Sequence, residues 1–375
     1  MMEPAPLQQV DRTYVLFQGR KLSYFAGCDY FRMASHPAVL RAMQDGVKRY
    51  GLNVAASRLT TGNHALYQRL ERQLARFFKA EAAVLISTGY MTNLAVAQAV
   101  AGQFSHALID EKAHVCLRDA AQFLGCPVFS FKNCDPADVT RLVKRCGRGA
   151  RIVLLTDGLY SGPGTVAPLV EYLKALPKQS LVLVDDAHGA GVVGPTGKGS
   201  PEFTGAERRR IVQTLTLSKA FGVYGGVVLC SRKLRQQIVD KSHCFVGSTP
   251  LPLPLANAAL TAIRLHRNGM GLRRRLRRNV ARVKAALCAA GVEVPAGPGA
   301  VVPIHPRTAN QASALRQALL AAGIYPSFIK YPSGPAAGYF RFVISSEHTP
   351  AQLDNLSGVL GRVCGKPLAR PGALR

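Results

Sequence analysis

The central part of the chain alternates amphipathic helical segments with short apolar runs. Leu66, Leu70, Leu74 and Phe77 recur every three or four residues, which predicts a helix with one buried face. Five runs rich in Val, Ile and Leu predict buried strands instead, at residues 83–87, 152–156, 181–185, 211–215 and 226–230. Because these runs are largely continuous rather than alternating, they favour a sheet covered on both faces, and therefore an α/β fold.

A different pattern begins after Pro250, Pro252 and Pro254, where we place a domain boundary. Apolar residues then recur at helical spacing from Leu272 to Leu287, and strand-like stretches follow at residues 301–304 and 340–344. We therefore expect four parts: an N-terminal segment 1–45, a large domain 46–250, a small C-terminal domain 251–364 and a flexible tail 365–375.

The helical segment after residue 270 carries much of the chain's charge, which is +27 overall. No acidic residue occurs between Lys241 and Gly291, and seven basic residues crowd one short segment of that stretch: Arg273, Arg274, Arg275, Arg277, Arg278, Arg282 and Lys284. The spacing predicts an amphipathic helix with an arginine-rich solvent face. Such a face is either merely solvated or attracts a polyanion, such as coenzyme A or an acidic carrier protein, and the sequence leaves both open.

Composition indicates a globular cytoplasmic protein. Apolar residues make up 48% of the chain and charged residues 18%, and no stretch is apolar enough to span a bilayer. The first twelve residues lack the basic start and apolar run of a secretory signal. The nine cysteines show no CxxC motif or zinc-type spacing, so we expect reduced thiols and no metal site.

One glycine-rich segment imitates a dinucleotide-binding loop. Residues 189–194 match G-x-G-x-x-G and follow an apolar run. Pro195, Gly197 and Gly199 come directly after it, so no helix is expected to open there and offer its N-terminus to a pyrophosphate. We therefore predict no dinucleotide site.

Two of the predicted strands end in reactive side chains. The run 181–185 leads into Asp185, Asp186 and His188, and the run 211–215 leads through Thr216 and Ser218 to Lys219. Ligands of such sheets gather beyond the carboxyl ends of the strands. Pyridoxal phosphate needs an amine for its aldehyde, an acid for its ring nitrogen and hydroxyl or backbone donors for its phosphate. Together the two segments predict a site for that cofactor, although Lys219 alone would indicate only a solvated turn residue.

At these residues the chain resembles the α-oxoamine synthase family of fold-type I pyridoxal-phosphate enzymes. Further motifs match in the family's order, from about Asp29 to Leu360: Ser57-Arg58 with Gly62 and Leu70-Glu71, Ser87-Thr88-Gly89-Tyr90 with Asn93, Asp110 with His114, Thr156-Asp157-Gly158 with Ser161, Ser248-Thr249-Pro250, and Arg341 with Ser345 and His348. The resemblance implies a large domain with a mostly parallel seven-stranded sheet covered by helices, plus a smaller α+β C-terminal domain.

The resemblance also implies roles for single residues. Lys219 would hold the cofactor as an imine and act as the general base, Asp185 would bond the ring nitrogen, His188 would contact the ring 3'-oxygen and His114 would stack on the ring. The other cofactor-binding positions carried over are Thr88, Gly89, Tyr90, Ser161, Thr216 and Ser218, with Thr249 reaching in from the neighbouring subunit of a homodimer. Arg341 would clamp the carboxylate of the amino-acid substrate, with Cys28 nearby.

The implied reaction joins an amino acid to an acyl thioester, on coenzyme A or a carrier protein, and releases carbon dioxide to leave an α-aminoketone. Cys28 and Asp157 stand where the family usually has Asn and Glu, and no counterpart of the family's N-terminal helix precedes Tyr14, so a different amino acid or acyl group is expected. An aminotransferase would share Lys219 and Asp185 without using a thioester. A nucleic-acid-binding chain is disfavoured because no aromatic residues are interleaved with the arginines.

Overall fold

The computed structural model describes residues 6–330 and 337–365 and divides into two compact units. The large unit comprises Met33–Tyr160 and Thr165–Met270. The small unit comprises the described parts of Met1–Arg32, Ser161–Gly164 and Gly271–Arg375. The domain limits given from the sequence stay a prediction, and its tail lies outside the described residues beyond Gly365.

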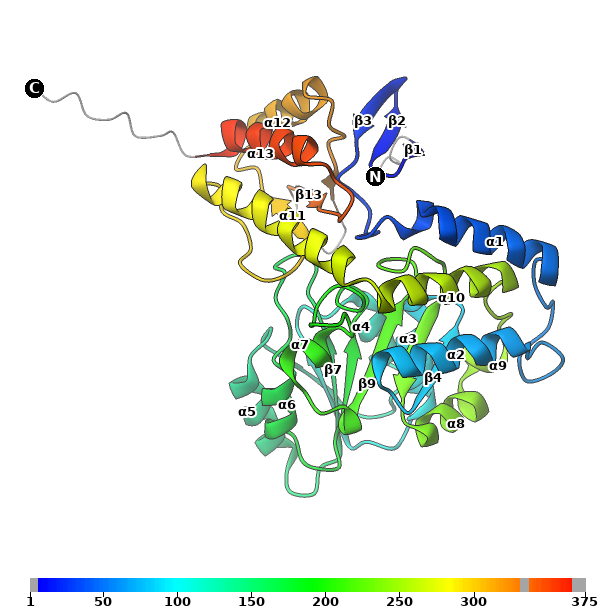
Figure 1. The fold of residues 1–375 in the computed structure, drawn as a ribbon. Coiled ribbons are helices and arrows are strands. Elements are labelled where there is room, and N and C mark those ends of the chain that lie inside the picture. Colours follow the sequence, from blue (N-terminus) through cyan, green and yellow to red (C-terminus); the bar gives the residue numbers. More distant parts are fainter. Residues whose placement is uncertain (1–5, 331–336, 366–375) are drawn as a thin grey trace, which may run out of the picture. The chain divides into compact units, whose positions relative to one another are not determined.

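A seven-stranded sheet forms the centre of the large unit (Figure 1). Its strand order is β4-β10-β9-β8-β7-β5-β6, and only β10 runs antiparallel to its neighbours. The strands are β4 (Ala82–Ile86), β5 (His106–Asp110), β6 (Val128–Phe131), β7 (Ile152–Asp157), β8 (Leu181–Asp185), β9 (Ile211–Thr216) and β10 (Gly226–Cys230). The mostly parallel sheet is therefore confirmed.

The five strands predicted from apolar runs all exist, each within about one residue of its expected limits. Two further strands, β5 and β6, were not predicted from the pattern. The four residues of β6 are exposed, half-buried, exposed and buried in turn, and β5 begins with a half-buried His106. Short strands of mixed polarity carry a weaker signal than the buried central ones.

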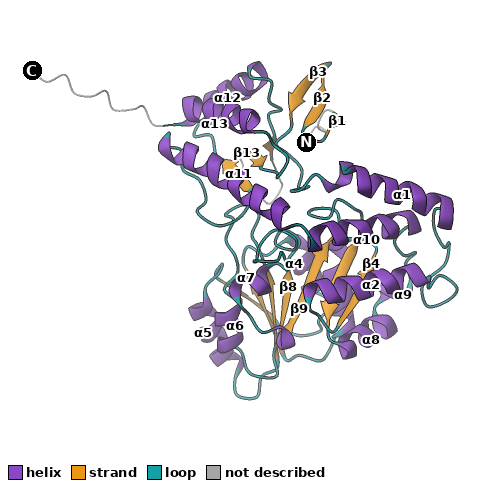
Figure 2. Cartoon of the chain, in the orientation of Figure 1, coloured by secondary structure: helices purple, strands orange, loops and turns teal. Residues whose placement is uncertain are grey.

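Helices cover both faces of this sheet, as Figure 2 shows. In β7, Val153 and Leu155 pack into one core cluster with residues of α3 and α4, while Ile152 and Leu154 pack into a second cluster with residues of α5 and α6. Neighbouring residues of a strand point to opposite faces, so burial on both sides explains the continuous apolar runs.

The helices of the large unit include the predicted one, which is α2. They are α1 (Pro37–Tyr50), α2 (Ala65–Phe78), α3 (Gly89–Ala99), α4 (Val115–Ala121), α5 (Pro136–Cys146), α6 (Leu169–Ala175), α7 (Ser200–Thr204), α8 (Arg232–Lys241), α9 (His243–Val246) and α10 (Leu253–Arg267), with short 3-10 helices at Met33–Ser35 and Arg208–Arg210. No α-helix starts between β8 and α7, so residues 189–194 open no helix, as predicted.

The small unit contains two three-stranded antiparallel sheets and three helices. One sheet is the N-terminal meander β1 (Gln8–Asp11), β2 (Tyr14–Phe17) and β3 (Arg20–Ser23), which the sequence pattern did not predict. The other has the order β11-β13-β12. Its strands and the unit's helices are β11 (Val301–Ile304), β12 (Phe328–Ile329), β13 (Tyr339–Val343), α11 (Met270–Ala289), α12 (Ala309–Ala321) and α13 (Pro350–Cys364).

Helix α11 is the basic amphipathic helix that the sequence predicts. Its buried residues include Leu276, Val280, Val283 and Leu287, and Arg274, Arg275, Arg277, Arg278 and Arg282 are exposed. Arg273 was wrongly assigned to the solvent face: it is buried, in phase with Leu276 and Val280. Across residues 6–330 and 337–365, none of the helices combines the length and hydropathy that crossing a bilayer requires.

Candidate active site

The carboxyl ends of β8 and β9 bring Lys219 and His188 together. These strands are parallel neighbours, so the segments that follow them leave the sheet at the same edge. The Lys219 Nζ lies 2.8 Å from the His188 Nε2, and both side chains are half-buried. An amine and an imidazole at this distance can exchange a proton directly.

The turn that carries Lys219 depends on a glycine. The Gly222 N–H donates to the Lys219 carbonyl at 3.1 Å, and Gly222 has a φ of +64°. A Cβ at this position would lie 2.2 Å from the backbone nitrogen of Ala34. Only glycine fits both the left-handed backbone and the close approach, so the turn holds Lys219 in one place.

The Asp185 carboxylate is held by several donors. The Asn93 Nδ2 donates to the Asp185 Oδ2 at 2.7 Å, the Cys116 Sγ lies 3.1 Å from the same oxygen, and the Ala187 N–H donates to the Asp185 Oδ1 at 3.0 Å. The Thr214 Oγ1 donates to the Asn93 Oδ1 at 2.7 Å, which fixes the orientation of the Asn93 amide. These donors fix the orientation of the Asp185 carboxylate.

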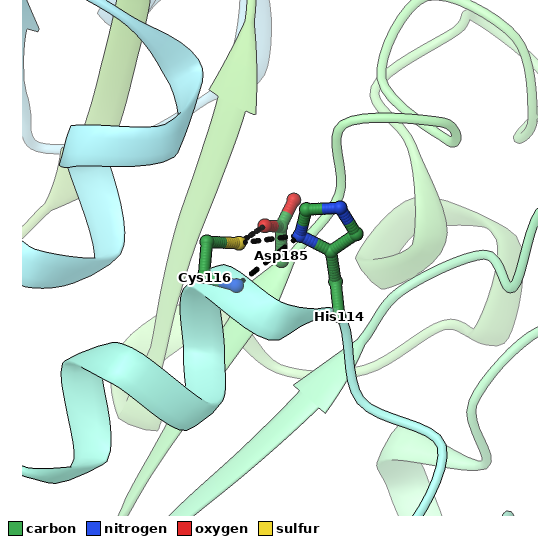
Figure 3. Close-up of side chains that lie close together, drawn as sticks. All are labelled: His114, Cys116 and Asp185. Atoms are coloured by element: carbon green, nitrogen blue, oxygen red, sulfur yellow. Dashed lines mark hydrogen bonds between the residues drawn. The ribbon is translucent and has the colours of Figure 1, made fainter. Parts of the chain in front are cut away.

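His114 lies beside this carboxylate at the start of α4 (Figure 3). Its Nδ1 accepts the Cys116 N–H at 3.3 Å and so caps the helix. Loss of water around the ring lowers the pKa of His114, although the Asp185 charge acts in the opposite direction. The capping bond and the lowered pKa both favour a neutral ring that carries its proton on Nε2.

The ligand atoms of His114, Cys116 and Asp185 all lie within 4.8 Å of one another, a spacing that a metal ion could use. Hydrogen bonds already join them, however: the Cys116 Sγ lies 2.9 Å from the His114 Nδ1 as well as 3.1 Å from the Asp185 Oδ2. Burial and the Asp185 charge raise the pKa of the Cys116 thiol far above its usual range. The protonated thiol therefore acts as a hydrogen-bond donor within the cluster.

The N-terminus of α3 forms an anion cradle against β9. The N-cap Thr88 accepts the Met91 N–H with its hydroxyl, and the backbone N–H groups of Gly89 and Tyr90 open the helix. A Cβ on Gly89 would lie 2.6 Å from the Thr216 Cβ, so glycine is what lets helix and strand approach. The Thr216 Oγ1 in turn lies 2.7 Å from the Ser218 Oγ, which adds two hydroxyls to the cradle.

Two predicted phosphate-binding residues use their side chains or backbone elsewhere. The Tyr90 hydroxyl donates to Asp119, and this bond raises the pKa of Tyr90 to about 12. Only the backbone of Tyr90 is thus directed to the start of the helix. Thr249 is exposed, and its carbonyl accepts from the Ser87 hydroxyl at 3.0 Å, next to Thr88.

Two further acids occupy this end of the sheet. Asp157 pairs in register with Asp185, and its Oδ1 accepts the His114 N–H at 3.2 Å. Burial and the Asp185 charge raise the pKa of Asp157 well above its ordinary value. Asp186 is fully buried, and its Oδ2 accepts from the Ser200 N–H at 2.9 Å and the Gln213 Nε2 at 2.6 Å.

The glycines that follow Asp186, whose spacing matches a dinucleotide-binding loop, pack closely against other parts of the large unit. A Cβ at Gly189 would lie 2.1 Å from an Asp186 carboxylate oxygen, and a Cβ at Gly199 would lie 1.8 Å from the other one. Gly191 and Gly194 have φ values of +83° and +85°. Gly189 and Gly199 therefore make room for the buried Asp186 carboxylate, and Gly191 and Gly194 provide left-handed backbone in the same loop.

The small unit holds the other predicted residues. Arg341 lies on β13, and its Nη2 is 3.4 Å from the Cys28 Sγ. Ser161 also belongs to this unit. His348 is buried: its Nδ1 accepts the Ser345 N–H at 3.0 Å and its Nε2 bonds the Tyr24 carbonyl at 3.1 Å. Because both ring nitrogens are engaged, His348 has a structural role, and burial lowers its pKa to about 3.

The sequence analysis assigned no role to Asn93, Cys116 or Thr214 in holding Asp185. Asn93 was quoted only within a motif, although a polar residue in the apolar stretch from Met91 to Ala99 signals a buried partner. Cys116 follows His114 by two residues, and nothing in the sequence indicates that its thiol meets Asp185.

Comparison with known proteins identifies the family. The chain matches the family described as aminotransferase class I and II over residues 28–360. It is 34% identical to an 8-amino-7-oxononanoate synthase of Thioalkalivibrio sulfidiphilus, over 92% of this chain and 88% of that protein. It also resembles the serine palmitoyltransferase of S. paucimobilis solved with PLP and myriocin bound, with a TM-score of 0.89 and 27% identity over 95% of this chain and 90% of that one. The serine palmitoyltransferase of Sphingomonas wittichii superposes with a TM-score of 0.90 and 26% identity, over 96% and 92% of the two chains.

Proposed function

The chain belongs to the aminotransferase class I and II family, and we propose that it joins an amino acid to an acyl thioester with loss of carbon dioxide, giving an α-aminoketone. The name 8-amino-7-oxononanoate describes such a product, because its amino and keto groups occupy adjacent carbons. The end of that molecule, a methyl group on the amine-bearing carbon, corresponds to alanine without its carboxylate. Alanine is therefore the first amino acid to test, and serine, which the serine palmitoyltransferases use by name, is the second.

The contact between the Lys219 Nζ and the His188 Nε2, beside a firmly held Asp185, is the observation that carries this proposal. The residues fit pyridoxal phosphate, the cofactor bound to the S. paucimobilis enzyme. Lys219 would hold its aldehyde carbon, Asp185 its ring nitrogen, His188 its 3'-oxygen and His114 the face of its ring. The start of α3, with the hydroxyls of Thr216 and Ser218 beside it, suits the phosphate, with donors from Thr88, Gly89, Tyr90, Thr216 and Ser218.

Bound pyridoxal phosphate supplies a protonated ring that draws electrons from the Cα of an amino acid. Asp185, which Asn93 and Ala187 hold in one orientation, would bond the ring nitrogen and keep its proton in place. Once the amino acid had replaced Lys219 on the cofactor, the freed Lys219 Nζ would be the base for the Cα proton, with the His188 Nε2 at 2.8 Å able to share that proton. A new bond from Cα to the thioester carbonyl carbon would replace its C–S bond, and the thiolate would leave. Loss of the carboxylate as carbon dioxide would then leave an electron pair on Cα, which would take back a proton from Lys219.

Arg341 would bind the carboxylate of the amino acid through its planar guanidinium, and Cys28 would lie beside that carboxylate. Ser161 is included in the proposal as a further cofactor contact, as the family resemblance implies. We also include a homodimer in the proposal, in which the exposed Thr249 reaches the phosphate of the partner subunit. Light scattering of the purified protein should then give twice the chain mass of 40.3 kDa.

The test combines cofactor attachment with turnover. Protein supplied with pyridoxal phosphate and reduced with borohydride should carry a pyridoxyl group on Lys219, seen by peptide mass spectrometry. A matrix of glycine, alanine and serine against short, medium and long acyl thioesters should give an α-aminoketone and free thiol from at least one pair. The substitution Lys219→Ala should abolish both signals, and the exposed Lys233→Ala should change neither.

Keto-acid formation without release of thiol would replace this proposal with an aminotransferase reaction. Absence of the pyridoxyl adduct at Lys219 would reject the cofactor assignment itself. Circular dichroism of both lysine variants distinguishes loss of chemistry from loss of fold.

A further inference from the structure

A basic groove lies within the large unit, away from the residues assigned to the cofactor. Its volume is about 670 Å³, and its walls are formed by α2, α10, the end of α1 and the turn at residues 196–198. Figure 1 shows α2 and α10 side by side, and the two helices pack on each other. Groove volumes in this range are typical of sites for small ligands.

Helical periodicity places cations along both walls. On α2, Arg69, Gln73 and Arg76 are spaced by four and three residues and therefore share one face. On α10, Arg264 and Arg267 share a face in the same way. Arg49, Lys79 and Lys198 complete seven basic residues in the groove lining, and that lining contains no acidic residue.

The positive charge of the groove is largely uncompensated. Lys198 pairs with Glu202 at 3.2 Å. Within the part of the chain that the structure describes, the other six bases form no ion pair. Like charges in one cavity repel, so the groove gains most from a ligand that brings several negative charges at once.

The remaining lining residues suit a ligand that is not purely ionic. Phe77 and Ile263 are buried members of the lining and offer apolar contact beneath the exposed cations. Gln73, Asn257 and Thr261 add neutral hydrogen-bonding groups. Arginine binds phosphate oxygens in pairs through its planar fork, so the four arginines of α2 and α10 match two or more neighbouring phosphates.

We propose that the basic groove binds a small molecule that carries two or more phosphate groups. The proposed reaction does not require this anion site, because its cofactor carries a single phosphate that would bind at α3. If the ligand is the nucleotide end of a coenzyme A thioester, the inference rests on the proposed function. If the ligand is a free nucleotide or pyrophosphate, it does not. Arg267 also follows His266, whose Nε2 lies 2.8 Å from the carbonyl of Ala220, the residue after Lys219. One turn of α10 thus reaches both the basic groove and the Lys219 turn.

Calorimetric titration of the full chain with pyrophosphate, coenzyme A and orthophosphate tests the site. Pyrophosphate and coenzyme A should bind more tightly than orthophosphate, and added salt should weaken all three. The triple variant Arg76→Gln, Arg264→Gln and Arg267→Gln should weaken pyrophosphate binding about tenfold or more, because it removes charge-assisted hydrogen bonds. The matched control, Arg274→Gln, Arg277→Gln and Arg278→Gln on α11, loses the same charge outside the groove and should leave the affinity within about twofold.

Equal weakening in the two triple variants would overturn the proposal, since binding would then follow net charge alone. Absence of pyrophosphate binding at physiological salt would overturn it too, as would binding of a DNA oligonucleotide or an acidic protein without binding of pyrophosphate. Unchanged thermal midpoints of both variants establish that the comparison is made between folded proteins.

Kinetics distinguish the two sources of phosphate. If coenzyme A is the ligand, the triple variant of the groove should show an about tenfold higher KM for an acyl-CoA and an unchanged kcat. Its KM for the matching N-acetylcysteamine thioester, which carries no phosphate, should stay the same. Loss of pyrophosphate binding with both KM values unchanged supports a free phosphorylated ligand. If no thioester gives an α-aminoketone, the proposed function fails, and the titration still decides the groove.

Discussion

Asp185 illustrates how single side chains set up this site. Its carboxylate accepts from Asn93, Cys116 and Ala187, and Thr214 orients Asn93 in turn. Asn93 is fully buried, and each of its polar atoms has a partner in this network. Removing such a residue leaves the groups that it served without partners, which costs more than the bond itself contributed.

The substitution Asn93→Ala should therefore lower the free energy of unfolding by about 1 to 3 kcal/mol, because Thr214 and Asp185 lose their bonds to the amide. Urea denaturation measures the change. Asn310→Ala, on the exposed face of α12, is the matched control and should stay within about 0.5 kcal/mol. Equal effects of the two substitutions would show that the buried network contributes nothing.

Asp186 gives a prediction about pH. Burial raises its pKa from the ordinary 3.8 to about 7. The folded state therefore holds this proton more tightly than the unfolded state, and the stabilisation from the neutral carboxyl is lost as pH rises from about 4 through about 7. Asp186→Asn cannot ionise. The stability of the native chain minus that of the variant, from urea curves at several pH values, should fall across this range; a flat difference would contradict the raised pKa.

At the scale of elements, Glu71 of α2 ties several pieces of the large unit together. It pairs with the buried Arg58 of the preceding loop, accepts the Leu85 N–H of β4 at 3.1 Å and lies 3.6 Å from Arg235 of α8. Both partners of the Arg58 pair are buried. One carboxylate thus fixes a loop, a helix and a strand relative to one another.

Glu71→Gln should lower the free energy of unfolding by about 3 to 5 kcal/mol, because it leaves the buried Arg58 charge without its counter-ion. Glu207→Gln removes a carboxylate that is 78% exposed and pairs with Arg209 at 3.6 Å, and should cost at most about 0.5 kcal/mol. Chemical denaturation of the two variants provides the comparison. Similar losses of unfolding free energy in the two variants would contradict a larger contribution from the buried pair.

On the scale of the whole molecule, the net charge of +27 means that repulsion between positive charges outnumbers the attractive pairs. Some of it is compensated locally, as where Arg275 pairs with Glu347 and Arg282 with Asp354 beside α11. Among the residues that the structure describes, Lys198 is the one base of the basic groove that pairs with an acid. Self-repulsion of this kind destabilises the compact state and is screened by salt.

The thermal midpoint should therefore rise when sodium chloride increases from about 10 mM to about 150 mM, which shortens the screening length from roughly 30 Å to roughly 8 Å. Differential scanning fluorimetry at fixed pH measures it. A falling midpoint would show that the surface ion pairs outweigh the repulsion between the excess positive charges.

Local sequence patterns were enough to predict the central strands of the sheet and the residues at their ends. Apolar runs in β7, β8, β9 and β10 are continuous because both faces of the sheet are covered by helices. Each run therefore predicts a buried strand without reference to the rest of the chain. The parallel order then brings Asp185 and Lys219 to one edge, which the sequence also predicted. β5 and β6 were not predicted because their runs of apolar residues are short and bounded or interrupted by polar ones.

The contacts between side chains, by contrast, depend on how the elements pack in three dimensions. Asn93 and Cys116 reach Asp185 because α3 and α4 pack on the same face of the sheet, and no spacing along the chain encodes that contact. Likewise, the cations of the basic groove come from segments far apart in sequence, and Arg273 of α11 is buried although its neighbours Arg274 and Arg275 are exposed. The physical reason is the same in each case: local patterns fix which face of an element is apolar, whereas the packing of whole elements fixes what that face and its polar edges touch.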